Sequence, residues 1–170
     1  MGRDPLSELA KRLETYRPAS LLAIGPRAAE RLVPYCDAHR DCPLTHLDAE
    51  GALGGEALLD ALSSRGRFDF ALIEGVLERL DPEHGGHLIA RLRDLNAKRF
   101  SVIVGAAPAA ERRWQTSDLI AMGLDRWSGG TLDGASVDVY GYDVGTYKVT
   151  PDWLNPRHWA HPEHWGKFRW

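Results

Sequence analysis

Residues 68–83 (FDFALIEGVLERLDPE) place an acidic residue and a glycine directly after a predicted buried strand. Phe70 to Ile73 form an unbroken apolar run, which is typical of a parallel strand covered on both faces. Glu74 and Gly75 follow where that strand should end. Open α/β sheets bind their ligands outside the carboxyl ends of the strands. Glu74 and Gly75 are therefore candidate ligand-contacting residues.

Three potential metal ligands, Cys36, His39 and Cys42, are spaced three residues apart in YCDAHRDC. Thiolates and imidazoles are the ligands that zinc prefers, and a histidine near the C-terminus could supply the fourth. Structural zinc sites usually carry paired arms of the C-x₂-C or H-x₃-H type, which this segment lacks. We therefore predict no metal site here. The chain has only two cysteines, too few for a disulfide framework.

Residues 151–170 are rich in side chains that rarely remain in water. They hold four of the six tryptophans (Trp153, Trp159, Trp165, Trp170), with His158, His161 and His164 and the cations Arg157, Lys167 and Arg169. Prolines at 151, 156 and 162 exclude a long regular helix. We expect this tail to pack on the domain or on a protein partner. Two alternatives are stacking of Trp and Arg on single-stranded RNA and metal binding by the histidines.

Alternating helix and strand patterns position these residues. The predicted strands cover residues 20–24, 44–48, 68–74 and 100–104, followed by a hairpin of residues 124–128 and 136–143 joined by 129–134. The predicted helices cover residues 5–16 and 27–33, a segment after the glycine-rich turn 51–55, a segment from residue 82, and one that ends at Gly123. This order predicts an α/β protein with a mostly parallel sheet that ends in an antiparallel hairpin.

Local patterns add detail to these elements. Pro34 is expected to end the second helix, and Asp81 to cap the helix that begins at Pro82. Leu88, Ile89, Leu92 and Leu95 form the expected core stripe of that helix, and Thr116 or Ser117 is the expected cap of the next one. In the second hairpin arm, Val137 and Val139 should face inward while Asp138, Tyr140 and Tyr142 face outward.

The strand at 68–74 and the loop after it resemble the fourth strand and following loop of class I S-adenosylmethionine (SAM) methyltransferases. The typical sequence pattern of that segment in the family is close to FDxVxxxxVLEHLxP. The terminal hairpin resembles that family as well. The resemblance implies a Rossmann-like, three-layer α/β/α sandwich. Only about 20 residues separate Asp48 from the next strand, too few for helix, strand and helix. The family's third strand, at the sheet edge, is therefore expected to be missing.

The same resemblance assigns candidate cofactor-binding residues. The family's first strand runs into (Glu/Asp)-x-Gly-x-Gly-x-Gly, and these positions fall on Ala23, Gly25, Arg27 and Ala29, of which only Gly25 matches. The resemblance implies that Gly25 and Arg27 line a SAM pocket, with Arg27 binding a carboxylate or phosphate. The alternative is an ordinary strand-to-helix turn at Pro26.

Asp48, 23 residues after Gly25, matches the acid that holds ribose hydroxyls in this family. The alternative is an aspartate that starts a turn. Glu74 and Gly75 correspond to the loop on the substrate side. The amino-group methyltransferase motif (Asp/Asn-Pro-Pro-aromatic) is absent, and the sequence predicts no catalytic residue.

Size and charge limit the remaining possibilities. The 170 residues fit one domain, residues 1–150 with an N-terminal helix within 1–18, followed by the tail 151–170. The net charge of −3 makes nucleic acid an unfavourable partner. No apolar run approaches the roughly 20 residues that cross a bilayer, and the N-terminus lacks a signal-peptide core, so we expect a cytoplasmic protein.

The sequence of the tail resembles that of a small bacterial family of unknown function. This resemblance implies no activity.

Three functions remain open. The first is a SAM-dependent methyltransferase, supported by the strand order and Asp48 and opposed by the degenerate first turn. The second is a methyltransferase-like fold without catalysis that acts as a binding or scaffold module through its Trp-rich tail. The third is a nucleotide or other small-ligand binder that uses the same crevice. We interpret the chain as a methyltransferase-like protein in which SAM binding is better supported than catalysis.

Overall fold

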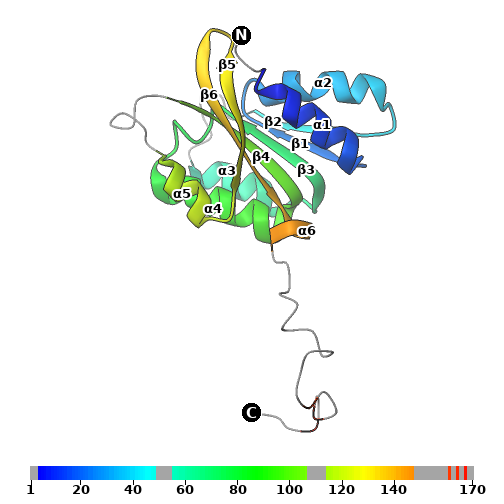
Figure 1. The fold of residues 1–170 in the computed structure, drawn as a ribbon, viewed down its shortest axis with the longest axis vertical. Helices are drawn as coiled ribbons and strands as arrows, with labels where there is room; N and C mark the ends of the chain where they lie inside the picture. The colour runs from blue at the N-terminus through cyan, green and yellow to red at the C-terminus, as the bar shows by residue number, and fades with distance from the viewer. Residues whose placement is uncertain are drawn as a thin grey trace.

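The protein is built around one mixed sheet of six strands in the order β2-β1-β3-β4-β6-β5 (Figure 1). The computed structural model describes residues 4–48, 55–106 and 114–147, together with His161, His164 and Lys167. Four strands are parallel: β1 (Leu21–Ile24), β2 (Leu44–Leu47), β3 (Phe68–Glu74) and β4 (Ala97–Gly105). An antiparallel hairpin, β5 (Asp125–Leu132) and β6 (Ala135–Asp143), completes the sheet through β6. The predicted α/β class and terminal hairpin are confirmed.

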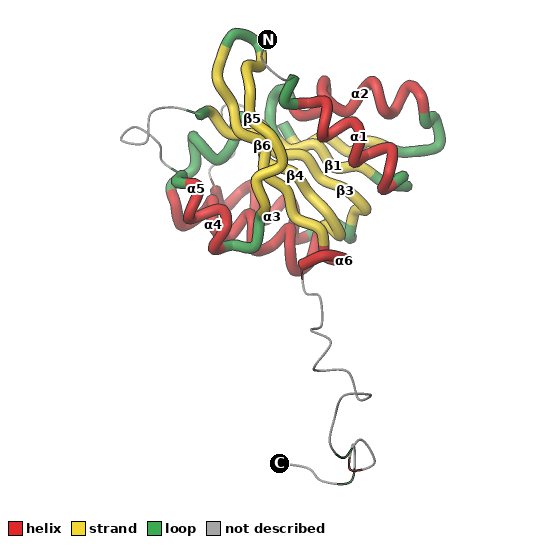
Figure 2. Tube along the Cα trace, viewed as in Figure 1, coloured by secondary structure: helices red, strands yellow, loops and turns green. Residues whose placement is uncertain are grey.

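Helices cover both faces of the sheet, which gives three layers (Figure 2). One face carries α1 (Leu6–Tyr16) and α2 (Ala28–Ala38), and the other carries α3 (Gly55–Ser63), α4 (Pro82–Arg91) and α5 (Thr116–Ala121). Apolar side chains alternate between these faces, so that Phe70 and Leu72 pack toward α1 and α2 while Ala71 and Ile73 pack toward α3 and α4. A short helix, α6 (Val144–Tyr147), follows β6. Across the described ranges, no helix has the length and apolar character needed to span a bilayer.

The strand β2 forms one edge of the sheet in the described part of the chain. The one described element between β2 and β3 is α3. Within the described residues, the connection from β2 to β3 therefore contains one helix, which agrees with the short spacing in the sequence.

The second helix does not end at Pro34, as was predicted, but continues to Ala38. Proline removes the amide that would bind the carbonyl of Glu30. Pro34 and Glu30 are both exposed, so that carbonyl lies on the side of the helix that faces water. The buried side chain of Tyr35 packs in the core directly after the proline, and this packing keeps the chain helical.

The prediction that Leu95 lies in the core is wrong, because the helix widens before it reaches that residue. Residues Leu92–Asn96 form one π-helical turn, η1, which adds a residue to the turn and shifts the buried face. Leu95 is exposed and Asn96 is buried instead. The Asn96 amide donates hydrogen bonds to the carbonyls of Leu62 and Arg65, each at 3.1 Å.

The cap of α5 also differs from the prediction. Gln115, rather than Thr116 or Ser117, is the N-cap, and it forms a reciprocal capping box with Asp118. Gly123 follows the helix with φ of 90°, which confirms its predicted place at the helix end. Asp81 caps α4 as predicted, since its carboxylate accepts the backbone N–H of His84 at 3.0 Å.

The hairpin is longer and more deeply buried than its sequence indicates. Both strands run through the glycine-rich segment to a two-residue turn at Asp133 and Gly134, which have φ values of 50° and 81°. All six residues 137–142 are buried, so the expected outward face is covered as well. Tyr140 and Tyr142 pack with α4 and α5 in the core on that side.

Candidate functional site

By topology, the carboxyl ends of β1 and β3 are the place where a sheet of this kind binds its ligands. These neighbouring parallel strands are in register from Leu21–Phe70 to Ile24–Ile73, so they end at the same edge of the sheet. From β1 the chain proceeds to β2 on one side, and later elements build the sheet on the other side. Open α/β sheets bind ligands at such a switch point.

Gly25 lies at the centre of this edge and joins three strand ends. Its N–H donates to the carbonyl of Leu47 at 3.0 Å, and Leu47 directly precedes Asp48. Its φ is 107°, and a Cβ built on it would lie 2.1 Å from the carbonyl oxygen of Glu74. A ring nitrogen of His46, Nε2, lies 3.0 Å from the Gly25 carbonyl. The structure therefore brings Gly25, Asp48 and Glu74 to one place.

Gly75 forms a second left-handed turn beside the first. Its φ is 70°, and a Cβ on it would meet Pro26 at 3.8 Å, an ordinary contact distance. The carbonyl of Gly75 accepts a hydrogen bond from Nε of Arg79 at 2.8 Å. The turns after β1 and β3 are thus in contact. The space beside the α-carbon of Gly75 would still hold a Cβ atom without a clash.

The side chain of Glu74 is held by Arg31, a residue that the sequence did not single out. Arg31 donates Nε to Oε2 and Nη2 to Oε1, each at 3.1 Å. The side chains of Arg31 and Glu74 are only 14% and 11% exposed. The hydrogen bond to Glu74 is the main reason that the pKa of Arg31 lies above its ordinary value. The negative charge of the Glu74 carboxylate is therefore balanced by the Arg31 guanidinium in a bidentate ion pair.

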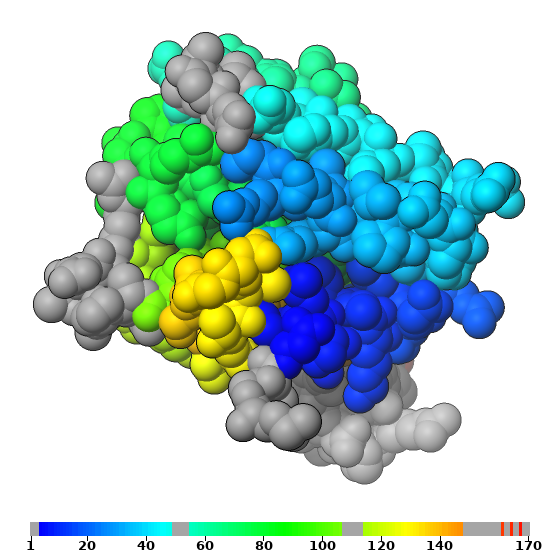
Figure 3. Space-filling model, turned by 90° about the horizontal axis from the view of Figure 1, so that it is seen from above, coloured from blue at the N-terminus to red at the C-terminus, as the bar shows by residue number. Residues whose placement is uncertain are grey.

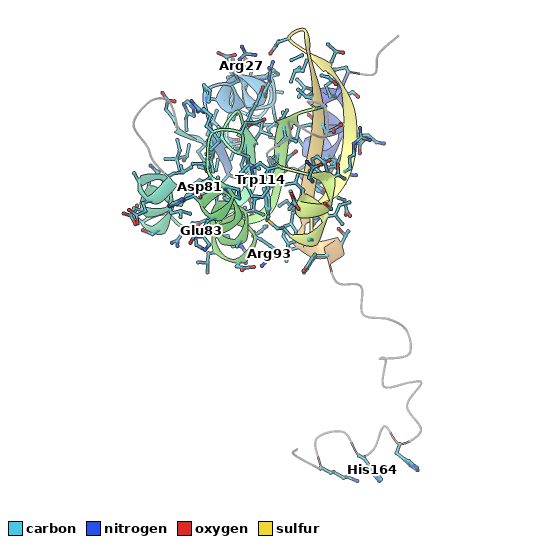
Figure 4. The ribbon with its side chains drawn as sticks, turned by 90° about the vertical axis from the view of Figure 1, so that its left-hand side faces the viewer. Arg27, Asp81, Glu83, Arg93, Trp114 and His164 are labelled. Atoms are coloured by element: carbon cyan, nitrogen blue, oxygen red, sulfur yellow. The ribbon has the colours of Figure 1, made fainter. Side chains whose placement is uncertain are left out.

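The turn of the β5–β6 hairpin adds Asp133 to this group of charged side chains, more than a hundred positions after Arg27 and Arg31 in the sequence. Asp133 accepts a hydrogen bond from Nη1 of Arg27 at 2.9 Å and also pairs with Arg31. These two arginines hold the pKa of Asp133 below its ordinary value, with Arg31 the larger cause. Figure 3 shows the hairpin turn against α1 and α2, and Figure 4 shows Arg27 at this end of the molecule. The sequence held one indication of this pairing. Arg27 and Arg31 are four residues apart and so lie on one helix face, where both can contact the same acidic residue.

The five residues predicted for the site are thus placed as follows. Gly25, Asp48 and Gly75 directly follow three neighbouring strands, and Glu74 is the last residue of β3. Arg27 precedes α2 and extends to Asp133. Asp48 is exposed at the end of β2. An exposed carboxylate can accept hydrogen bonds from ligand hydroxyls, and a half-exposed guanidinium can bind an anionic group.

The cysteine segment has its own local packing. Cys42 donates its thiol to the carbonyl of Pro18 at 3.1 Å, and the ring of His39 stacks on Tyr35 with centroids 4.1 Å apart. Burial raises the pKa of the Cys36 and Cys42 thiols. Among the described residues, no group of three or more His, Cys, Asp or Glu side chains is arranged to hold a metal ion. His158 and the four tail tryptophans lie outside the described residues.

Two cavities lined by described residues lie beside α1 rather than at the strand ends. One of about 490 Å³ separates the start of α1 from β5, with Ser7, Glu8, Arg126 and Trp127 in its walls. The other, of about 280 Å³, runs between α1 and α2. Neither includes Gly25, Arg27, Asp48, Glu74 or Gly75 in its lining.

The fold is that of SAM-dependent methyltransferases. It is similar to magnesium protoporphyrin IX methyltransferase from Synechocystis PCC 6803 with bound SAM, with TM-score 0.53, 14% identity, and coverage of 79% of this chain and 74% of that chain. It is also similar to 1,6-didemethyltoxoflavin-N1-methyltransferase from Burkholderia thailandensis with bound 1,6-didemethyltoxoflavin and S-adenosylhomocysteine (SAH). That likeness has TM-score 0.54, 18% identity, and coverage of 79% and 75%. At such identities the likeness concerns the fold alone.

The chain belongs to a family of unknown function, DUF6231, whose sequence profile matches residues 3–170. The match includes the Trp-rich tail as well as the α/β domain. No curated protein matches the chain.

Proposed function

We propose that this protein binds SAM, and its demethylated product SAH, across the carboxyl ends of β1, β2 and β3. The observation that carries the proposal is the position of Gly25. Its N–H binds Leu47 next to Asp48, and its α-carbon lies against the carbonyl of Glu74. Gly25 thereby joins the ends of three strands at the switch point of a fold shared with proteins crystallised with SAM and SAH.

The chemistry of these residues fits such a ligand. Asp48 would accept hydrogen bonds from the two ribose hydroxyls, and the half-exposed Arg27 would bind the carboxylate of the methionine part. The left-handed turn at Gly75 leaves bare backbone beside the ligand, and Gly25 lets the first turn lie directly against the carbonyl of Glu74. Pro26 offers no N–H, so the first turn supplies one amide fewer than a glycine would. Bound SAM would supply an activated methyl group.

A second candidate is a binding module of the same fold that does not transfer the methyl group. The pair between Glu74 and Arg31 favours it, because both oxygens of the carboxylate nearest the substrate-side loop are already hydrogen-bonded to a guanidinium. A carboxylate whose two oxygens already accept hydrogen bonds from a guanidinium is less available to contact a substrate. Formation of SAH from SAM on incubation with extracts or candidate substrates would favour methyl transfer over this alternative.

Calorimetric titration of the full-length protein with SAM and with SAH tests the proposal. Asp48→Asn should weaken binding by about tenfold or more, because hydrogen bonds to a charged acceptor each contribute about 1.5–3 kcal/mol. Asp41→Asn is the matched control, an exposed aspartate in the loop that precedes β2, and it should leave affinity unchanged. Titrations with adenosine and ATP separate SAM binding from general nucleotide binding. Absence of heat and of any thermal shift at about 1 mM SAM and SAH would contradict the proposal.

A further inference from the structure

Exposed apolar side chains are concentrated on three elements of the described structure, η1, α5 and α6. Five large hydrophobic residues in the described ranges are more than two-fifths exposed. Four of them lie on η1, α5 and α6, with exposed fractions between 45% and 58%: Leu95, Ile120, Val144 and Tyr147. The fifth, Val33, lies on α2 and is 44% exposed.

The three segments that carry these four residues meet around Tyr147. The ring of Tyr147 packs against Tyr142 with centroids 5.2 Å apart, and a Cβ on Gly123, just after α5, would lie 2.5 Å from its Cε2 atom. Arg93 of η1 donates to the carbonyl of Met122 at 3.1 Å. Figure 4 shows Arg93 near α6, at the opposite end of the molecule from Arg27. We call Leu95, Ile120, Val144 and Tyr147 the α6 patch.

The α6 patch lies where the C-terminal tail begins, because residue 148 follows Tyr147 directly. The first tryptophan of the tail, Trp153, is six residues beyond Tyr147, and Leu154 follows it. Six residues span at most about 20 Å, which is enough for Trp153 to reach the elements that surround α6. An exposed apolar patch beside a segment with four tryptophans indicates a docking surface and its occupant.

We propose that the tail of the same chain, residues 148–170, packs on the α6 patch, with Trp153 and Leu154 as its first contacts. A segment tethered next to its binding site has an effective concentration in the millimolar range. A tail from a second copy at micromolar concentration competes poorly with it. Tryptophan also buries a large area with few rotatable bonds, which suits it to be the anchor of such a contact. This inference does not depend on SAM binding at the other end of the molecule.

Tryptophan fluorescence quenching of the full-length protein tests this docking. Four of the six tryptophans lie in the tail, while Trp114 of the domain is buried. In the wild-type protein, most of the emission should be protected from acrylamide. Val144→Ser, and more so Leu95→Ser combined with Val144→Ser, should raise the quenchable share toward four tryptophans in six.

Val33→Ser is the matched control, since it removes the same side chain at nearly equal exposure on α2. It should leave quenching unchanged. Because all these residues are exposed, the variants should retain the far-UV circular dichroism of the wild type. Equal quenching in the Val144 and Val33 variants, or free tail tryptophans in the wild type, would overturn the proposal. So would a sedimentation coefficient of a dimer that reverts to monomer in the Val144 variant, since the patch would then bind a second copy.

Discussion

Arg31 binds both carboxylate oxygens of Glu74 in a geometry of two parallel hydrogen bonds, each of 3.1 Å. The two residues are 43 positions apart and come from different layers, since Arg31 belongs to α2 and Glu74 ends β3. The pair therefore fixes the helix after the first strand against the strand end that adjoins Gly25. It also links this edge to the hairpin, because Arg31 pairs with Asp133.

Replacing Arg31 should destabilise the protein through the carboxylate that is left behind. Arg31→Met leaves Glu74 nearly buried without its counter-ion, and we expect the free energy of unfolding to fall by about 3 kcal/mol. Arg31→Lys should recover only part of this loss, because lysine cannot make the bidentate contact. Urea unfolding followed by circular dichroism measures both effects.

A second substitution separates the ion pair from simple packing. Glu74→Gln in the Arg31→Met background removes the unpaired charge, so the double variant should regain about half of the lost stability. If the double variant were as unstable as the sum of the two single variants, the loss would come from side-chain packing and not from an uncompensated charge.

Gly25 should tolerate no side chain. Gly25→Ala combines a left-handed φ of 107° with a Cβ that would lie 2.1 Å from a backbone oxygen, and we expect a loss of about 3 kcal/mol or more. Gly134→Ala tests the conformational part alone, since φ is 81° and no atom lies within 4 Å of the added Cβ. It should cost about 1–2 kcal/mol.

Gly66→Ala is the neutral reference for this series, with open space and no left-handed φ. Thermal unfolding of the three variants should rank them in the order Gly66, Gly134, Gly25, from least to most destabilised. A Gly25→Ala protein as stable as Gly134→Ala would contradict the close approach of the two turns.

The stability of the strand ends opposite the site should depend on pH through Asp69. Its carboxylate pairs with Lys98 at 2.6 Å and accepts the N–H of Ala19 at 2.9 Å. The Lys98 hydrogen bond is the main reason that the pKa of Asp69 lies below its ordinary value. A lowered pKa contributes stability that is present above the unfolded value of about 3.9 and is lost as the pH falls through the lower folded value.

Asp69→Asn should therefore reduce the unfolding free energy at neutral pH by about 1 kcal/mol, a modest amount because Lys98 is half exposed and the pair is screened by water. The same variant should lose less stability than the wild type between about pH 5 and pH 2. Asp60→Asn, on the exposed side of α3, is the matched substitution that removes one carboxylate away from Lys98. Parallel curves for wild type and Asp69→Asn would contradict this role for Asp69.

The order of elements could be predicted from the sequence because β1 and β3 contain unbroken apolar runs and some helices, such as α4, have a local start signal. The run from Phe70 to Ile73 and the Asp81–Pro82 cap are local features, and both are confirmed. Leu95 was misplaced because the π-helical turn shifts the buried face by one residue, an effect that no periodic pattern shows. The helix through Pro34 continues because of tertiary packing by Tyr35, which overrides a local rule.

The candidate site was only partly accessible to sequence reasoning. Parallel strands must end at one edge, so the meeting of Gly25, Asp48 and Glu74 follows from the strand order alone. The partner of Glu74 does not, because it comes from a helix 43 residues away. Gly25 was predicted either to line a cofactor pocket or to form an ordinary strand-to-helix turn, and its close contact with the Glu74 carbonyl requires glycine there in both cases.

The central claim is that SAM and SAH bind where β1, β2 and β3 end, and a crystal structure of the full-length protein with SAH tests it most directly. We predict SAH with its ribose hydroxyls on the carboxylate of Asp48 and its methionine part beside Gly25 and Arg27. SAH in the cavity between α1 and β5, or no bound SAH in crystals soaked at about 1 mM, would contradict the proposed site.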